Sequence, residues 1–599
     1  MKKILVVLMV ALLIAGVFSA CSQNTRSSSS GVKNGVEISV LGMASGQDDL
    51  NLVRDMLTKA GFVVNLNMQA DIATFIAQRD AGNYDLYVSN WTTVTGNPDY
   101  AVRSLFKTGG DFNSSGIANP RVDELIELAA TQTPAEYPRT YTELERELVE
   151  RNAYLVPLYR NVKAQGINQA ILKPESVRIS KALAMAWWIM DFKDESRRET
   201  QPLIITQPAG TLTSLDPIKG NDGSINTLNS NMYLRIVTLT DDDKVIPDGS
   251  LSWQFAIGEG NSDFYFVLRD DVNFARVENM RSVNTGVRVG AEDVVFTLNR
   301  AKDRNSVPDH RTFSLHESMK EISIVTDINV LDSVRDSDTG RPIRQILEAK
   351  TPRPITSLTG NKSAANNAAG VYQVVKITTN FPFPQVLNYL AHQSAGVVSE
   401  RQISAVNTYN VATFDRTRDI PYGDQSVITE GNTYNNHLWV SGPYIAVYKN
   451  DYQIYFEKNP GFMRGTEHEP KIRFVDVKFI ADSDAALSAL RSQEIYAIPT
   501  VLTSKWDLVT SDPNLMLQTV PSNAVTYAMC NLRRILSDVN LRQAVLYSIN
   551  QQDIMAFYDN KYYRAYTTLT PLVDTGNLHN ADSNKVNEYL AKYWESQGK

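Results

Sequence analysis

Stretches with a two-residue apolar period alternate with stretches of helical period along most of the chain. Residues 64–68 alternate between apolar and polar side chains, which predicts a strand. Apolar side chains recur at helical spacing over residues 122–129, 141–148, 486–490 and 541–549, which predicts amphipathic helices. This alternation predicts a mixed α/β protein.

The first twenty residues form a pattern typical of an export signal. Lys2 and Lys3 precede an apolar run that ends at Phe18, and the run is shorter than the roughly 20 residues of a membrane span. The four residues that end at Cys21 resemble the cleavage box of a bacterial lipoprotein. We therefore expect lipid on Cys21 and a flexible tether in the Ser-rich segment that follows it. Plain secretion with an incidental cysteine is the alternative.

Length and composition add two bounds. A chain of 599 residues is too long for one core, so two or three domains are expected. The net charge of −7 argues against nucleic acid as the main partner. The only cysteine besides Cys21 is Cys530, which lies in an apolar, strand-like run and is predicted to be a buried small side chain.

Two sets of short motifs stand on either side of residue 200. The set after it comprises Leu215-Asp216-Pro217, Ile246-Pro247, Ser252-Trp253, Phe266-Val267-Leu268-Arg269 and Ala291 to Phe296. The set before it comprises Gly82 to Leu86, Trp91, Asn119 to Leu125 and Val156-Pro157-Leu158. The later set resembles the beginning of the family 5 extracellular solute-binding proteins of ABC transporters, the peptide- and nickel-binding group. The earlier set resembles the end of the same family.

This reversed order implies a circular permutation. The resemblance implies a two-lobed, periplasmic-binding-protein-like α/β fold (type II, cluster C), with an extra subdomain in the first lobe. A family pattern stands at Asp538 to Ala544, and its expected continuation stands at Glu37 to Val40. The polar stretch from Asp191 to Gln201 would join the family's original ends. Fusion of two damaged genes is the rival interpretation, but no element is missing or duplicated.

The resemblance also implies domain boundaries. In chain order, we expect a lipoprotein signal peptide (1–20), a tether (21–35), most of the second lobe (36–165), a return to the first lobe with the linker (166–199), the first lobe (200–535) with its inserted subdomain (246–375), and the first part of the second lobe (536–599).

The stretch from Tyr84 to Thr93 predicts a strand whose end opens onto a cleft. In peptide-binding relatives the residues beside the equivalent of Trp91 pair through their backbones with an extended peptide, which is β-augmentation. Core packing of Trp91 is the alternative. The resemblance implies ligand contacts at Asn90, Trp91, Thr92 and Thr93, and on the opposite lobe at Thr211, Leu212 and Thr213. Aromatic candidates for stacking on a sugar include Tyr434 and Trp439.

One departure from the family bears on the ligand. Oligopeptide- and dipeptide-binding relatives carry an aspartate three residues after that tryptophan, and it pairs with the peptide's free amino group. Val94 occupies the position here, and Asp99 is a conceivable substitute. A buried ammonium without a carboxylate is costly, so Val94 argues against this mode of binding. A blocked peptide or an oligosaccharide would not need the carboxylate.

No catalytic motif stands out, and the six histidines show no metal-ligand spacing. We therefore expect no enzyme activity, cofactor or metal. The sequence predicts an exported, lipid-anchored, monomeric substrate-binding subunit of an ABC importer, which delivers a peptide or similar extended solute to permease subunits. The alternatives are an oligosaccharide-binding protein, or a sensory or adhesive surface lipoprotein. A hydrolase is the third and weakest.

Overall fold

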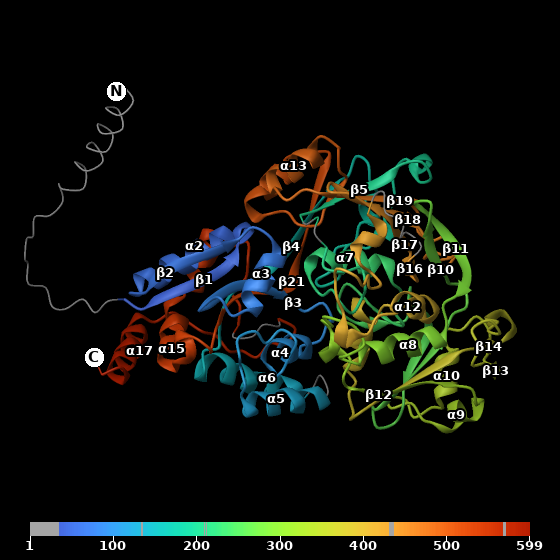
Figure 1. Cartoon of the computed structure of the whole chain (residues 1–599), viewed down its shortest axis with the longest axis horizontal. Coiled ribbons are helices and arrows are strands. Elements are labelled where there is room, and N and C mark those ends of the chain that lie inside the picture. The colour runs from blue at the N-terminus through green and yellow to red at the C-terminus, as the bar shows by residue number, and fades with distance from the viewer. Residues whose placement is uncertain are drawn as a thin grey trace, which may run out of the picture.

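The backbone of the protein is organised around one ten-stranded mixed sheet (Figure 1). A computed structural model describes residues 35–132, 136–208, 210, 212–429, 437–566 and 571–598. The strand order in the sheet is β17-β18-β19-β5-β20-β4-β21-β3-β1-β2. Cys21 and the predicted tether lie outside the described residues.

Two long strands cross the middle of this sheet, β4 (Leu155–Asn168) and β21 (Leu515–Cys530). They pair antiparallel along nearly their whole length, with a shift of register between Pro521 and Val525. Residues 155–159 and 164–168 of β4 are buried, whereas residues 160–163 between them are partly exposed. The two ends of the pair thus lie in separate cores, and the less buried centre joins them.

The first core, which we call the β1 lobe, gathers segments from both ends of the chain. Its buried residues come from positions 36–159 and 525–573, and the aromatic side chains of the last helix pack against them. Its strands are β1 (Glu37–Met43), β2 (Val63–Gln69) and β3 (Leu86–Thr92). Its helices are α2 (Gln47–Lys59), α3 (Ile72–Asp80), α4 (Asp99–Phe106), α5 (Pro120–Thr131), α6 (Tyr137–Glu145), α15 (Val539–Ser548), α16 (Gln551–Phe557) and α17 (Ser583–Ser596).

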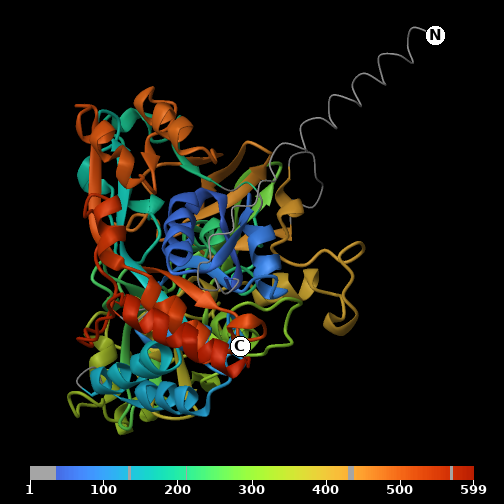
Figure 2. The ribbon, with the colours of Figure 1, turned by 90° about the vertical axis from the view of Figure 1, so that its left-hand side faces the viewer.

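The local sequence explains where several of these helices begin. The Asn119 side chain accepts a hydrogen bond from the Arg121 backbone N–H, and Pro120 occupies the first turn, so α5 starts with a cap and a preset φ. The Asp538 side chain caps α15 in the same way. In Figures 1 and 2, α17 and the β1–β2 pair lie at the same end of the molecule.

The second core, the β5 lobe, holds the other half of the sheet. Trp187 lies fully buried at its centre, edge-on to Phe456 and Tyr444. Its strands are β5 (Pro202–Gln207), β6 (Thr238–Leu239), β7 (Val245–Ile246), β10 (Asn273–Glu278), β11 (Arg281–Arg288), β16 (Trp439–Val440), β17 (Tyr444–Lys449), β18 (Gln453–Lys458), β19 (Phe474–Phe479) and β20 (Ala497–Ile498). Its helices are α7 (Gly223–Met232), α11 (Val386–Leu390), α12 (Glu400–Val406), α13 (Ser483–Arg491) and α14 (Trp506–Thr510).

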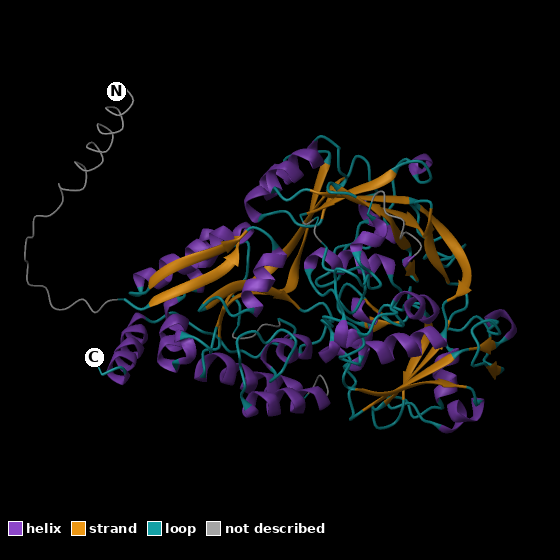
Figure 3. Ribbon diagram, in the orientation of Figure 1, coloured by secondary structure: helices purple, strands orange, loops and turns teal. Residues whose placement is uncertain are grey.

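A separate four-stranded antiparallel sheet lies below the β5 lobe in the view of Figure 3. Its strands run in the order β12-β15-β9-β8. They are β8 (Ser252–Ile257), β9 (Asp263–Leu268), β12 (Met319–Val325) and β15 (Val374–Thr379), covered by α8 (Ala291–Ala301), α9 (Ile328–Ser333) and α10 (Ile343–Glu348); β13 (Ser357–Leu358) and β14 (Val371–Tyr372) form a small parallel pair beside them.

The periodicity predictions agree with these elements. Residues 64–68 lie in β2, and the helical patterns at 122–129, 486–490 and 541–549 lie in α5, α13 and α15. The pattern at 141–148 starts in α6 and continues through a π-helical turn. Cys530 is fully buried, and burial raises the pKa of its thiol to about 12, so the thiol stays protonated. Within the described part of the chain, no helix combines the length and hydropathy that crossing a bilayer would require.

A buried ion pair between Asp216 and Arg300 joins the β5 lobe to α8 of the four-stranded sheet. Their side chains are 0% and 7% exposed, and the guanidinium donates to both carboxylate oxygens. We expect Asp216→Ala to lower the free energy of unfolding by about 3–5 kcal/mol, because it leaves the Arg300 charge buried without a partner. Urea denaturation measures the loss. Asp55→Ala, which breaks an exposed pair with Arg54, should cost less than about 1 kcal/mol; equal losses would contradict the prediction.

Candidate functional site

A cavity of about 570 Å³ lies where the two lobes meet. Its volume is within the range of sites for small molecules and short peptides. The wall combines the end of β3 with the centres of β4 and β21, the loop before the Trp187 turn, and the start of α7 with the chain that follows it. The lining residues come from within the segments 90–94 (without Thr93), 161–163, 178–189, 221–249, 391–393 and 522–524, with single residues from 443 to 500.

The end of β3 presents an open strand edge to this cavity. Along one edge β3 pairs with β21, and along the other it pairs with β1 only at Leu86 and Tyr87. Beyond Tyr87, no strand of the described residues covers this second edge. The open edge therefore begins at residue 88 and reaches the cavity wall.

Hydrogen bonds at both ends of β3 show which backbone groups face the open edge. The Asp85 carbonyl accepts from the Asn531 N–H at 2.8 Å, and the Thr93 N–H donates to the Asn523 carbonyl at 3.0 Å. Odd-numbered residues thus form the bonded pairs with β21, and peptide groups alternate in direction along a strand. The N–H and C=O groups of Asn90 and Thr92 consequently point away from β21, toward the open edge.

The residues predicted on β3 have different positions. Asn90, Trp91 and Thr92 line the cavity, whereas Thr93 is fully buried and forms no part of the wall. Asn90 is exposed, and Thr92 is partly buried. The structure therefore brings three of these four residues to the site.

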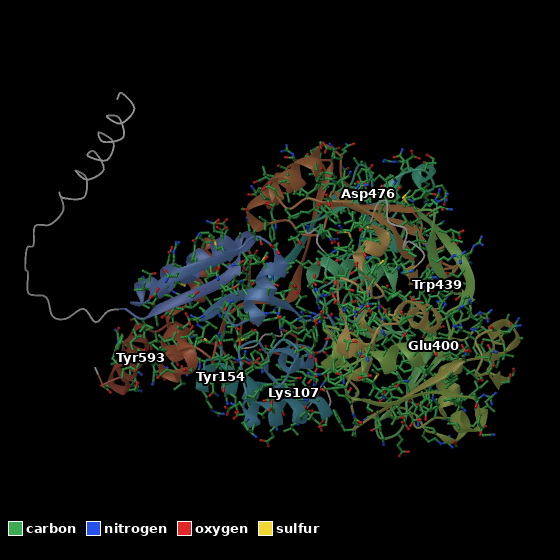
Figure 4. The ribbon with its side chains drawn as sticks, viewed as in Figure 1. Lys107, Tyr154, Glu400, Trp439, Asp476 and Tyr593 are labelled. Atoms are coloured by element: carbon green, nitrogen blue, oxygen red, sulfur yellow. The ribbon has the colours of Figure 1, made fainter. Side chains whose placement is uncertain are left out.

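Of the residues predicted on the opposite lobe, the three described ones do not line the wall. Leu212 is buried in the β5 lobe, and the Thr213 hydroxyl donates to Asp222 at 2.7 Å on the protein's exterior. Thr211 and Tyr434 lie outside the described residues. Trp439 is 8% exposed, belongs to β16 and packs near Phe274, on the far side of the β5 lobe from β3 (Figure 4).

Trp91 has a double role in the structure. Its ring packs against the hydrophobic side chains of both lobes, with ring centroids 4.9 Å from Tyr100 and 5.4 Å from Phe112. Its indole Nε1 is buried and has no hydrogen-bond partner among the described residues. Tyr100 in turn exchanges hydrogen bonds with Asn221 of the other lobe. Trp91 therefore lies both in the hydrophobic packing and in the cavity wall.

The possible substitute for the missing aspartate is unavailable. Val94 lines the cavity. Asp99 is fully buried outside the wall, where Arg103 Nε at 2.7 Å and the Tyr389 hydroxyl donate to its Oδ2, and Arg103 Nη2 donates to its Oδ1 at 3.2 Å. Since both oxygens of Asp99 are engaged in this way, a ligand ammonium cannot use them.

The charged residues of the wall are mostly paired. Asp241 binds Arg178 at 2.9 Å, Lys181 lies 3.2 Å from Asp242, and Asp248 lies 3.2 Å from His468. The remaining acid of the wall, Asp222, caps α7 by accepting a hydrogen bond from the Ser224 N–H. Two wall cations remain without an ion pair among the described residues, and they are Lys163 and Arg235.

Lys163 projects from the centre of β4. Its ammonium donates to the Leu183 carbonyl, and burial lowers its pKa to about 8, against a smaller opposing effect of the Asp241 charge. A buried ammonium held only by a neutral carbonyl is poorly compensated, which explains the direction of the shift.

Arg235 follows α7 in the apolar run Tyr233 to Val237. Its Nη1 donates to the Ser230 and Tyr233 carbonyls at 3.1 and 3.0 Å, and its Nε is buried without a partner. Burial alone lowers its pKa to about 10, so it still carries its charge at neutral pH. Sequence reasoning missed this residue, although a single arginine within an apolar run was the available signal.

His392 stands beside Arg235 in the wall. Its Nδ1 accepts from the Ser394 backbone N–H at 3.2 Å, so the ring proton is on Nε2, which is buried without a partner. Burial, and then the Arg235 charge, lower its pKa to about 3 and keep the ring neutral. Its ring centroid lies 5.6 Å from that of Tyr100.

The described residues contain one grouping with metal-ligand chemistry, at the mouth of the cavity. Ligand atoms of Asp248, Glu467 and His468 lie within 4.8 Å of one another. The two carboxylates are 72% and 85% exposed. A surface hydrogen bond between His468 and Asp248 accounts for this arrangement, and we assign no metal to it.

Comparisons with known proteins complete the description of the site. Residues 247–599, more than half of the chain, match the family model described as bacterial extracellular solute-binding proteins, family 5 Middle. Comparison with curated protein sequences gives no match.

Among solved structures, a peptide complex of DppA from Helicobacter pylori is similar at 16% identity and TM-score 0.45, with 67% of each chain covered. AppA from Bacillus subtilis with a nonapeptide has 15% identity and TM-score 0.44, with 66% of this chain and 64% of that chain covered. AgaA from A. tumefacien R10 with agropinic acid has 16% identity and TM-score 0.35, with coverages of 52% and 46%.

The lowered pKa of Lys163 predicts a pH-dependent stability. An unfolded lysine titrates near 10.4, so between about pH 8 and 10.4 the unfolded chain binds more protons than the folded one. Burial of the charged Lys163 ammonium lowers the stability of the folded protein. This loss of stability is fully present below pH 8 and disappears as the pH rises through this window. The stability of Lys163→Met relative to the natural protein should therefore fall between pH 7 and 10, as measured by urea denaturation. Lys181→Met, which removes a paired lysine of the same wall, is the control; the same trend in both variants would contradict the prediction.

Proposed function

The chain belongs to the bacterial extracellular solute-binding proteins of family 5, and from this premise we propose that it captures a peptide or similar extended solute between its two lobes. Proteins of this family bind substrates for ABC transporters and are not enzymes. The protein would deliver the captured solute to permease subunits.

The observation that carries the proposal is the open edge of β3 in the cavity wall. The N–H and C=O groups of Asn90 and Thr92 face this edge without a strand partner among the described residues. An extended peptide could continue the sheet there through main-chain hydrogen bonds, which give affinity for any sequence. Side chains of the peptide would then select through the pockets around the strand.

Capture would require the lobes to close. Several contacts already join the β1 lobe to the other side of the cavity: Asp111 accepts from the Ser314 backbone N–H at 2.9 Å, and Lys107 Nζ lies 3.2 Å from Glu317. The lobes would close about a hinge at the centre of the β4–β21 pair, and contacts of this kind would hold the closed form. A ligand would favour closure because it binds the closed form more tightly than the open one.

We further propose export and lipid attachment at Cys21, with the protein acting as a monomer outside the cytoplasm. The charged and apolar leader and its cleavage box support this part of the proposal. The lipid would hold the protein at the membrane near its permease. A sensory or adhesive role would use the same anchor.

The second candidate ligand is an oligosaccharide. Trp91, Tyr100 and Trp188 contribute aromatic rings to the cavity wall, and aromatic faces stack on sugar rings. Val94 argues against a ligand with a free amino terminus. It does not discriminate between a sugar and a blocked peptide.

The segment order is also part of the proposal, as a circular permutation of the family fold. Its support is that residues 36–159 and 525–594 contribute to one core, and that α17 packs on α15 through Tyr589 and Tyr547 at 5.9 Å. The segment from Asp191 to Gln201, which would join the original ends, is largely exposed at residues 193–196. The domain boundaries expected from the sequence follow from the same proposal.

A substitution that removes one backbone donor tests β-augmentation. The Thr92 N–H faces the open edge, so Thr92→Pro removes a ligand hydrogen bond without breaking the ladder to β21. We expect peptide binding to weaken by about 0.5–1.5 kcal/mol in calorimetry with a peptide pool. Thr92→Val keeps the N–H and should bind like the natural protein. Unchanged affinity in Thr92→Pro would refute the assignment of this edge.

Reordering the chain tests the permutation. A variant that opens the chain between Asp194 and Glu195, and joins residues 598 and 35 by a flexible linker of about ten residues, should keep the fold because both changes fall on exposed or terminal segments. Circular dichroism and thermal melting should match those of the natural order. A chain that opens within β5, with the same linker, is the control and should not fold. Failure of both chains would count against the permutation.

A further inference from the structure

The guanidinium of Arg235 is fixed in the cavity wall but has no counterion. Two backbone carbonyls, of Ser230 and Tyr233, hold its Nη1. No acid of the described residues forms an ion pair with it, and burial is the only cause of its lowered pKa. Its Nε is buried without a partner among the described residues, and Nη2, on the same edge of the planar fork, makes no hydrogen bond to them. A fixed, charged and unpaired group at a solute cavity is poised to receive an anion.

The surroundings of Arg235 add donors rather than negative charge. His392 is held neutral with its proton on Nε2, and the Trp91 indole offers Nε1–H; both atoms are buried without partners. The Tyr100 ring links these two donors, since its centroid lies 4.9 Å from that of Trp91 and 5.6 Å from that of His392. Two amide oxygens of the wall, on Asn226 and Gln393, also lack partners, but they carry no charge.

The acids of the same wall cannot neutralise Arg235 because they are already engaged. Asp241 binds Arg178, Asp248 lies beside His468, and Asp222 caps α7. A carboxylate that would hold an ammonium is missing at the family position, since Val94 lines the wall and Asp99 is sealed in its pair with Arg103. Among the described residues, Asp222 is the one wall acid without a cation, and both of its oxygens already accept hydrogen bonds, from Thr213 and Ser224. The charge of the wall therefore favours a ligand held by an acid group rather than by an amine.

We propose that the solute bound in this cavity carries a carboxylate, which pairs with the free edge of the Arg235 guanidinium. The Nε and Nη2 donors of an arginine match the two oxygens of a carboxylate, and charge-assisted bonds of this kind are among the strongest in proteins. The proposal rests on the proposed function, and it narrows the solute to an acidic one. The carboxylate could belong to a peptide or to a uronic acid.

Matched ligand pairs test this inference in the purified protein. One pair is a pool of N-acetylated tetrapeptides that contain glutamate and the same pool with glutamine, both amidated at the C-terminus. The other pair is a uronic-acid oligosaccharide and its methyl ester. Thermal shift followed by calorimetry should show that the acidic member of one pair binds about tenfold or more tightly than its neutral partner. The pair that responds identifies the source of the carboxylate.

Variants assign the preference to Arg235. Arg235→Gln should bind the acidic and neutral members equally, and Arg235→Lys, which keeps the charge but loses the fork, should retain an intermediate preference. Arg178→Gln removes a wall arginine that Asp241 already pairs, so it should keep the full preference. Melting curves confirm that each variant is folded.

The outcomes separate the two proposals. Equal binding of acidic and neutral ligands by the natural protein overturns the carboxylate inference and leaves the proposed function standing. A preference that persists in Arg235→Gln overturns the assignment to this residue. If no peptide or saccharide of either pair stabilises the protein, the proposed function fails and the inference fails with it.

Discussion

The antiparallel pairing of β4 with β21 is the constraint on which the rest of the structure depends. Each strand is long enough to enter both cores, so the two lobes share one sheet rather than meeting at a surface. The register shift between Pro521 and Val525 interrupts the ladder where the burial of β4 is lowest. A bulge in an antiparallel pair bends the strand and increases its twist, so the sheet turns at this place and leaves room for the cavity.

The cavity gains its chemical character from what surrounds this bend. One side supplies bare peptide groups at the end of β3, which can bind a backbone of any sequence. The other side supplies the chain after α7, where Arg235 lies fixed by carbonyls. A general main-chain contact and a specific charged contact thus come from different lobes, and only an arrangement in which both lobes approach can offer them together.

Much of the fold could be predicted from the sequence because periodicity is a local property. The strand at residues 64–68 and the helices at 122–129 and 541–549 follow directly from the spacing of apolar side chains. The family predicted from the short motifs is confirmed by the family model over residues 247–599. The segment order stays a prediction, since the match to the family model begins at residue 247 and does not include the motifs before residue 200.

The site was harder to predict, because cavity membership is set by packing between distant segments. Asn90, Trp91 and Thr92 reach the wall because they end a strand at the lobe boundary. Trp439 does not, since the short β16 pairs it with Arg276 of β10, in a separate sheet. Arg235 was missed because its importance comes from the absence of a nearby acid, which only three-dimensional neighbours reveal.

An uncovered strand edge is normally a risk to a soluble protein, since it can template pairing with a second molecule. Here the edge of β3 opens into the cavity, whose wall also includes side chains of the opposite lobe. The wall that would hold a solute thus also limits the access of a second chain to this edge. Any state in which the lobes separate without a ligand would expose this edge, so closure and colloidal stability are linked through the same few backbone groups.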